Sequence, residues 1–330
     1  MMRNGFQFRM IKLVLFFLVL VLGVAAQQPA SLPWPPCQAS PVIGSADTLR
    51  SLSAGYFGDP GFDSAILLAT NAHTADPAYK FISDRYHLPS GGHACIPALA
   101  DAEHLRFNYA LYISAVRESM LPVPPDVSQS LIAIDTSKPV RVVSWADARK
   151  VQSLKNGSGG WKTTAPTDLW VTVVPSLKNF CQTFVSTHAS TPQQLVERLE
   201  ERLGLPPESG KSRFIEITIT SPSSMANLFR PCASPSVTTS TCALGAPPDS
   251  AGVYRTWFLG QYYSSYGTAS PNQYPWTSLG YTFDWALRDD SRYGQFVRFG
   301  ESEFVIPKDA PIQIESVTDT DQYCSPNKSL

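Results

Sequence analysis

Carboxylates are the side chains of this sequence that are best suited to chemistry, because several of them gather in short segments. Two carboxylates that face each other across a cleft can hydrolyse a glycosidic bond. The first group, Glu197, Glu200 and Glu201, lies among Arg198 and Arg202, so we expect a solvated, ion-paired helix face. The second group surrounds an apparent turn and consists of Asp284, Asp289, Asp290, Glu301 and Glu303. Its spacing is not that of an EF-hand calcium loop.

Aromatic side chains are concentrated between Tyr254 and Tyr293. This stretch of 40 residues holds 12 of the 37 aromatic residues, two to three times its share of the chain. Aromatic faces stack on sugar rings, so a carbohydrate platform is one interpretation; a packed core is the alternative that we expect for most members. The members are Tyr254, Trp257, Phe258, Tyr262, Tyr263, Tyr266, Tyr274, Trp276, Tyr281, Phe283, Trp285 and Tyr293.

Common catalytic signatures are absent from the sequence. It has no G-x-S-x-G, H-E-x-x-H, P-loop or G-x-G-x-x-G motif, and its five histidines are scattered. Cys181 and His188 form the single local pairing that a cysteine nucleophile would need, but a disulfide is the stronger expectation for Cys181. We therefore expect no metal and no cofactor, and we favour binding over catalysis.

The first 26 residues have the pattern of an export signal. Arg3, Arg9 and Lys12 form a basic region, Leu13 to Val24 is apolar, and Ala25-Ala26 supplies small residues for cleavage before Gln27. The apolar run is shorter than the roughly 20 residues of a membrane-spanning helix. We expect residues 1–26 to be cleaved and the protein to be exported to the periplasm, cell wall or extracellular space; an uncleaved anchor is the alternative.

Export agrees with the cysteine content. All six cysteines follow residue 26, and an even number in an oxidising compartment predicts disulfides. Six cysteines allow about 15 connectivities. Proximity in the sequence favours a disulfide between Cys232 and Cys242. A disulfide between Cys37 and Cys95 would join the two ends of the opening module. Cys181 and Cys324 then remain as the third pair.

The charge balance argues against two classes of partner. Without the signal, 23 basic residues face 27 acidic ones, and no basic run occurs. Nucleic acid and anionic membranes are therefore disfavoured. A hydrophobic content of 43% favours a packed globule.

The segment from residue 45 to residue 71 predicts two short helices. Asp47 is placed as the N-cap of the first, and Leu49, Leu52 and Tyr56 form its apolar face. Asp59 and Pro60 begin the second helix. Its apolar face is Phe62, Ile66 and Ala69, and Asn71 is placed to leave it in the left-handed region. Short strands are expected on either side, at residues 41–43 and 94–97.

This opening region resembles a LysM domain. The residues that carry the resemblance are Asp47-Thr48-Leu49, Leu52, Tyr56, Gly58-Asp59, Ile66-Leu67, Asn71, Pro89-x-Gly91 and Ile96-Pro97. Ala46 stands where the family usually has glycine. The resemblance covers roughly Pro41 to Pro97 and implies a β-α-α-β module that binds N-acetylglucosamine-containing glycans such as peptidoglycan or chitin. It places the sugar groove at Asp47, Thr48 and Leu49, and at Thr70 and Asn71.

The remaining chain predicts a connecting helix and a larger domain. Residues 99–120 have helical periodicity and are followed by a proline-rich linker. Strands are expected at residues 140–145, 169–174 and 214–220, the last half-buried, and residues 191–203 predict a capped helix ending on Gly204. A final hairpin is expected at residues 304–306 and 312–317. Residues 274–277 and 280–285 resemble runs in uncharacterised exported bacterial proteins, which implies no function.

We therefore predict an α+β protein with four parts: the signal at 1–26, a β-α-α-β LysM-like module at 37–97, a connecting helix and linker at 98–137, and a larger α+β domain at 138–330. The expected function is the binding of peptidoglycan or a related glycan in the cell envelope. After signal cleavage we expect no integral membrane segment. Two alternatives remain: a glycan-acting envelope hydrolase that the module targets, and a structural or protein-binding envelope protein without glycan binding.

Overall fold

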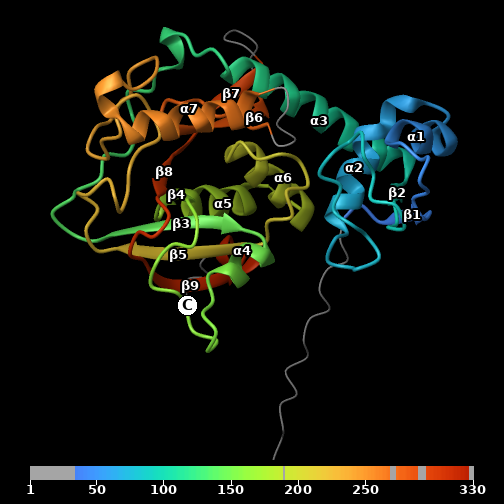
Figure 1. Cartoon of the computed structure of the whole chain (residues 1–330), viewed down its shortest axis with the longest axis horizontal. Coiled ribbons are helices and arrows are strands. Elements are labelled where there is room, and N and C mark those ends of the chain that lie inside the picture. Colours follow the sequence, from blue (N-terminus) through green and yellow to red (C-terminus); the bar gives the residue numbers. More distant parts are fainter. Residues whose placement is uncertain (1–33, 189, 268–272, 289–294, 327–330) are drawn as a thin grey trace, which may run out of the picture. The chain divides into compact units, whose positions relative to one another are not determined.

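A five-stranded antiparallel sheet organises the larger part of the chain (Figure 1). β-branched and aromatic residues dominate its strands, as expected for a buried pleated surface. The strands predicted at residues 140–145 and 169–174 are confirmed. In spatial order the strands are β8 (Phe304–Ile306), β4 (Leu169–Val173), β3 (Val140–Ala146), β5 (Arg213–Ile219) and β9 (Gln313–Asp319).

The computed structural model describes residues 34–188, 190–267, 273–288 and 295–326. The predicted signal at residues 1–26 lies outside these ranges. The described residues belong to one compact unit that contains helices and several antiparallel sheets. Within them, no helix combines the length and the apolar character that crossing a membrane requires.

Strand β5 is buried on both faces, so the expectation of a half-buried strand is wrong. Ile215 and Ile217 point to one core, while Phe214 and Glu216 on the opposite face are also almost inaccessible to solvent. β5 is an inner strand, paired with β3 on one side and β9 on the other. Helices α5 (Ser176–Thr187) and α6 (Pro192–Arg202) cover the face that carries Phe214, which the alternating pattern had predicted to be exposed to solvent.

The predicted final hairpin is also wrong. β8 pairs with β4 and β9 pairs with β5, so the two strands form opposite edges of the sheet. The segment around residues 307–311 therefore crosses the sheet instead of making a tight turn. Both strands exist near the predicted positions, but their partners come from distant parts of the chain.

Helices α5 (Ser176–Thr187) and α6 (Pro192–Arg202) cover one face of the sheet (Figure 1). Leu177, Leu195 and Leu199 pack there against residues of β3 and β5. The predicted signals at the ends of α6 are confirmed: Thr191 caps its start, and Gly204 follows its end with a φ of 63°. Two short helices, α4 (Ala148–Ser153) and α8 (Thr320–Tyr323), flank β3 and β9.

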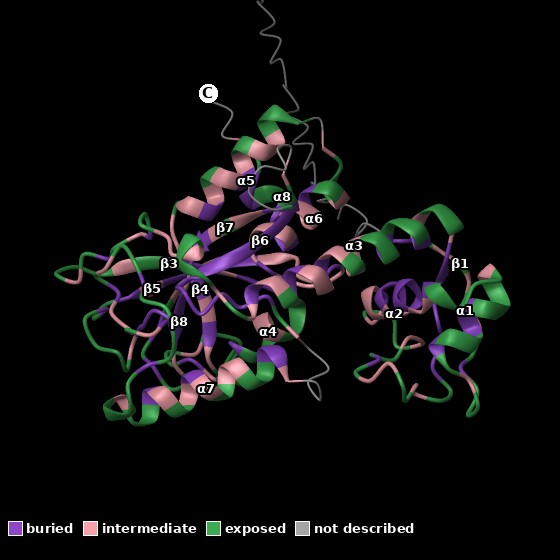
Figure 2. Cartoon of the chain, turned by 90° about the horizontal axis from the view of Figure 1, so that it is seen from above, coloured by how far each residue is buried: buried purple, intermediate pink, exposed green. Residues whose placement is uncertain are grey.

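An aromatic layer packs beside α5 and α6. It consists of the antiparallel pair β6 (Tyr281–Leu287) and β7 (Phe296–Ser302) with η3 (Asp249–Ala251) and α7 (Val253–Tyr266). Strand β6 is buried over all but its last residue (Figure 2). Helix α3 (Leu99–Ser119) contributes Tyr112 and Val116 to the same cluster, which confirms the connecting helix predicted at residues 99–120. The turn η2 (Pro124–Asp126) follows it.

The N-terminal region has the order strand, helix, helix, strand. Its elements are β1 (Cys37–Ala39), α1 (Leu49–Phe57), η1 (Pro60–Phe62), α2 (Asp63–Ala72) and β2 (Ile96–Pro97). β1 and β2 pair antiparallel. The first strand lies earlier than predicted, and of residues 41–43 Val42 makes an isolated bridge to His93. The residues predicted to form the apolar faces of the two helices are buried, except Tyr56, which is exposed.

Three disulfides link the cysteine pairs that proximity and elimination favoured, which confirms this part of the prediction. They are Cys37–Cys95, Cys181–Cys324 and Cys232–Cys242. Three disulfides are typical of a chain that folds in an oxidising compartment, in agreement with export.

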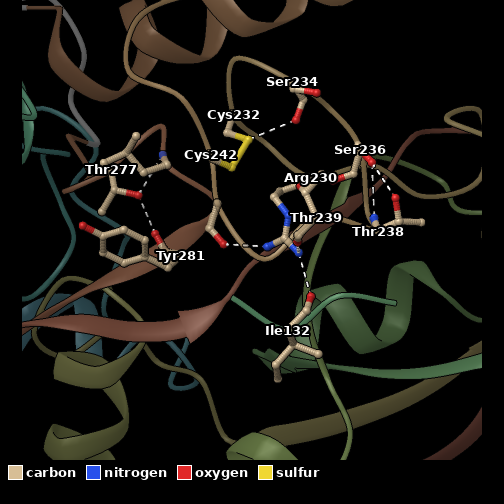
Figure 3. Close-up of a disulfide and its surroundings, with 12 residues drawn as sticks. Ile132, Arg230, Cys232, Ser234, Ser236, Thr238, Thr239, Cys242, Thr277 and Tyr281 are labelled. Atoms are coloured by element: carbon tan, nitrogen blue, oxygen red, sulfur yellow. Dashed lines mark hydrogen bonds between the residues drawn. A yellow bond between two sulfur atoms is a disulfide. The ribbon is translucent and has the colours of Figure 1, made fainter. Parts of the chain in front are cut away.

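The loop that carries Cys232–Cys242 is also fixed by Arg230, whose side chain is fully buried (Figure 3). Its guanidinium donates to the carbonyls of Gly280, Ile132 and Thr239 and stacks over the Phe304 ring. A planar guanidinium with several donors can join three segments in this way, which a lysine ammonium on a flexible stem does less well.

Candidate functional site

The loop before α1 is held by its own side chains. The Thr48 hydroxyl accepts from the backbone N–H of Ser51 at 3.0 Å, and the Ser51 hydroxyl accepts from the N–H of Thr48 at 2.9 Å. The predicted N-cap, Asp47, is therefore wrong by one residue, because Thr48 and Ser51 complete a capping box. Asp47 instead accepts from the N–H of Gly44 at 2.7 Å, which closes the loop on itself.

Leu49 and Thr70, two more of the predicted groove residues, are buried. Leu49 packs in the core of the module, and the Thr70 hydroxyl accepts from the backbone N–H of Cys95 at 2.9 Å. This bond joins α2 to the segment that leads into β2. Both side chains support the module from inside and do not face solvent.

Asn71 fixes the long connection between α2 and β2. Its side-chain amide donates to the carbonyl of Ile82 at 3.1 Å, and its side-chain oxygen accepts from the N–H of the same residue at 2.8 Å. The predicted left-handed exit at Asn71 is wrong, since α2 continues to Ala72 and His73 follows with a φ of −92°. Asn71 thus makes its two bonds to Ile82 from within the last turn of α2.

The two predicted loops border one apolar cluster. Leu49 from the start of α1 shares it with Ile82 and the partly buried Leu88 of the α2–β2 connection. The same connection carries two exposed aromatic side chains, Phe81 and Tyr86. The region thus combines two anchored loops, exposed residues at positions 44–46 and aromatic surface, which can offer polar groups to sugar hydroxyls and apolar faces to sugar rings.

A cysteine and histidine cluster lies inside the module. The Nε2 atom of His73 is 3.3 Å from the sulfur of Cys37, and Cys95 completes a group whose atoms lie within 4.8 Å of one another. Both sulfurs are joined in a disulfide. Metal binding needs thiolates, so in this oxidised form the cluster supports the fold and offers no sulfur ligand.

The acidic face predicted on α6 is solvated only in part. Glu200 is fully buried, and its carboxylate accepts from the backbone N–H groups of Ser209 and Glu208. Burial raises the pKa of Glu200, and it raises that of Glu201 to about 7. Glu197 accepts from His104 at 2.6 Å, and this bond raises the His104 pKa. The expectation of a solvated face is therefore wrong for Glu200, which anchors the loop after α6.

Two acids of the second group are bound to arginines. Asp284 on β6 is fully buried and accepts from both terminal nitrogens of Arg198, at 3.0 and 2.7 Å. Glu301 on β7 accepts from Arg202 at 2.9 Å. These pairs tie α6 to β6 and β7, so neither carboxylate is free to act on a substrate. Asp289 and Asp290 lie outside the described residues.

The aromatic stretch is mainly core, as expected. Tyr254, Phe258 and Trp285 are among the buried residues of the aromatic cluster. Tyr263 is 72% exposed, and Tyr274 is 36% exposed and lines a cavity. Tyr293 lies outside the described residues. A subset of the stretch thus faces open space.

That cavity has a volume of about 580 Å³ and lies between β3, β4 and the aromatic layer. Its wall includes Thr172, Trp276 and Glu303, in addition to Trp170 and Lys211. Sequence reasoning named Glu303 only as one of several acids and did not single out Thr172 or Lys211. An isolated threonine in a strand gives no local signal, because the cavity forms from segments that are distant in sequence.

No family model matches this chain, and neither a curated protein nor a solved structure matches it. The likeness of the opening region to LysM domains therefore rests on the quoted residues alone.

Proposed function

We propose that the protein is exported to the cell envelope and binds N-acetylglucosamine-containing glycan, such as peptidoglycan, through its N-terminal module of residues 37–97. The larger part would then be retained at the glycan. The resemblance to LysM domains motivates the proposal, and the strand, helix, helix, strand order agrees with it.

The observation that carries the proposal is the anchoring of two loops over one apolar cluster. Asp47 holds the loop at Gly44, and Asn71 holds the connection at Ile82. Loops that are rigid before binding lose little conformational entropy when a glycan chain is bound. In this proposal Asp47 and Asn71 act by positioning backbone groups, while Thr70 and Leu49 support them from the core.

The test is a pull-down of the mature protein, beginning at Gln27, on insoluble peptidoglycan and on chitin. We expect the wild type to bind, and a variant with Asp47→Ala and Asn71→Ala to lose most of its binding because both loops are released. Asp59→Ala is the matched control. Asp59 also accepts one backbone N–H, from Gly61, but it lies at the junction of α1 and η1, at the other end of α1.

Folding of each variant is verified by circular dichroism and by a thermal melt. Absence of binding by the oxidised, folded wild type would reject the proposal. Equal loss in the Asp59→Ala control would also contradict it, because the effect would then reflect the stability of the module and not the two loops.

A further inference from the structure

The cavity beside the sheet contains buried polar groups without partners. Thr172 and Trp276 are each only 5% exposed, and within the part of the chain that the structure describes the Thr172 hydroxyl and the Trp276 indole N–H make no hydrogen bond. One carboxyl oxygen of Glu303, Oε2, likewise has no partner there. Buried polar groups in proteins are almost always paired, so three unpaired groups around one cavity require an explanation.

Sheet pairing brings two of these groups together. Thr172 lies opposite Val143 in the β3–β4 pair, and Val171 lies opposite Phe304 in the β4–β8 pair. Glu303, just before β8, is therefore the cross-strand neighbour of Thr172, and both side chains line the cavity. The Trp276 ring stands nearly perpendicular to the Trp170 ring at 6.4 Å between centroids, so two indoles form part of the same wall.

Glu303 is not compensated by a cation. Within the described chain it has no ion pair, and burial raises its pKa to about 8. At neutral pH it is therefore mainly a neutral carboxylic acid, which can both donate and accept a hydrogen bond. The other titratable groups that line the cavity are Asp147, Lys150, Asp168, Lys211, Tyr274 and Tyr281.

Most of those other groups already have protein partners. Asp168 accepts from the Trp257 indole at 2.8 Å and from the backbone N–H of Lys308. Lys150 donates to the Thr167 hydroxyl. Within the described chain the Lys211 ammonium and the Tyr274 hydroxyl also make no hydrogen bond, so the groups left for a ligand are these two together with the hydroxyl of Thr172, the indole N–H of Trp276 and the carboxyl of Glu303, beside aromatic surfaces.

We infer that this cavity binds a neutral saccharide of one or two rings. Sugar hydroxyls match the unpaired hydroxyl, indole N–H and carboxyl of Thr172, Trp276 and Glu303, and the C–H face of a sugar ring matches the tryptophan and tyrosine surfaces. The volume of about 580 Å³ lies in the usual range of small-molecule sites and suits a mono- or disaccharide. This site is separate from the module and does not depend on the function proposed for it.

The test uses the full mature protein and two probes, N-acetylglucosamine and its β-1,4-linked disaccharide, followed by tryptophan fluorescence and by isothermal titration calorimetry. We expect saturable binding that changes the tryptophan fluorescence, since Trp170 and Trp276 line the cavity. Thr172→Val should weaken binding by about tenfold or more, because it removes one polar partner of the sugar. Thr172→Ser, which keeps the hydroxyl, should restore most of the affinity.

Thr172→Val is informative because the hydroxyl has no partner in the free protein. Its removal should leave the melting temperature unchanged or slightly raised, so a loss of affinity cannot be attributed to unfolding. The effect of Thr172→Val on the affinity should be the same in an Asn71→Ala background, in which the proposed binding loops of the module are already impaired. No saturable binding of either probe to the oxidised wild type, or equal affinity in the Thr172→Val variant, would overturn the inference.

Discussion

At the scale of single residues, Glu303 combines an uncommon protonation state with an incomplete set of hydrogen bonds. Its backbone N–H donates to the carbonyl of Gly280, but its side chain is partly buried in the cavity wall without a compensating cation in the described chain. A carboxyl that stays neutral in the folded state and ionises in the unfolded state makes stability depend on pH.

We predict that the stability of the wild type falls between pH 5 and pH 9. The pKa of Glu303 is about 8 in the folded protein, well above the ordinary value of 4.5. Its contribution to stability is therefore full below the unfolded pKa and is lost as pH rises through the folded pKa. Glu303→Gln stays neutral, so at pH 9 it should be more stable than the wild type by roughly 1–4 kcal/mol.

Urea unfolding at several pH values measures this difference. Near pH 4 the two proteins should be almost equally stable. Glu315→Gln, at an exposed position on β9, is the matched control and should follow the wild type at every pH. A Glu303→Gln variant whose stability falls as steeply as that of the wild type would show that Glu303 is already ionised in the folded state.

At the scale of elements, α6 is joined to β6 and β7 by buried ion pairs. Arg198 and Arg202 reach Asp284 and Glu301, and both guanidinium groups also lie over the Phe180 ring of α5. The network connects three elements at a place where apolar packing alone would fix the helix less specifically. One carboxylate, Asp284, receives hydrogen bonds from both arginines.

We predict that Asp284→Ala destabilises the protein by about 3–5 kcal/mol, because the two arginines lose their buried partner. Asp319→Ala provides the comparison. It removes the acid of the exposed Arg213–Asp319 pair and should cost about 0–1 kcal/mol. Thermal and urea unfolding of the two variants measure both values. Equal costs at the two sites would mean that the buried network contributes no more than a surface ion pair.

The helices and strands also show which features of the fold can be predicted from the sequence. The Thr191 cap, the Gly204 terminator and the strands β3 and β4 follow from local chemistry, and all four are where the sequence predicts them. Strand partners do not follow from local pattern, since the separate edges formed by β8 and β9 depend on contacts between distant segments. The cavity is less predictable still, because Thr172 and Glu303 become neighbours only after β4 and β8 have paired.

At the scale of the whole molecule, the disulfides differ in what they enclose. Cys181–Cys324 spans 143 residues and joins α5 to the segment after α8, whereas Cys232–Cys242 spans 10 residues within one loop. Cross-links that enclose longer segments restrict the unfolded chain more strongly. The first bridge therefore constrains most of the larger part of the chain.

We predict that the double variant Cys181→Ser, Cys324→Ser loses about 2–5 kcal/mol of stability, and more than the double variant Cys232→Ser, Cys242→Ser loses. Differential scanning calorimetry of the oxidised proteins would give the order. The opposite order would indicate that the loop held by the short disulfide and Arg230 contributes more to stability than the long disulfide does.

The order of strands in the sheet has a consequence for biosynthesis. Both edge strands, β8 and β9, are encoded after residue 303, whereas β3, β4 and β5 are complete by residue 219. Until the last part of the chain emerges, the inner strands have unpaired edges on both sides, and such edges invite pairing with other chains. The sheet is thus closed only after nearly the whole chain has emerged, and a chain that stops shortly before residue 304 lacks both protective strands and becomes prone to aggregation.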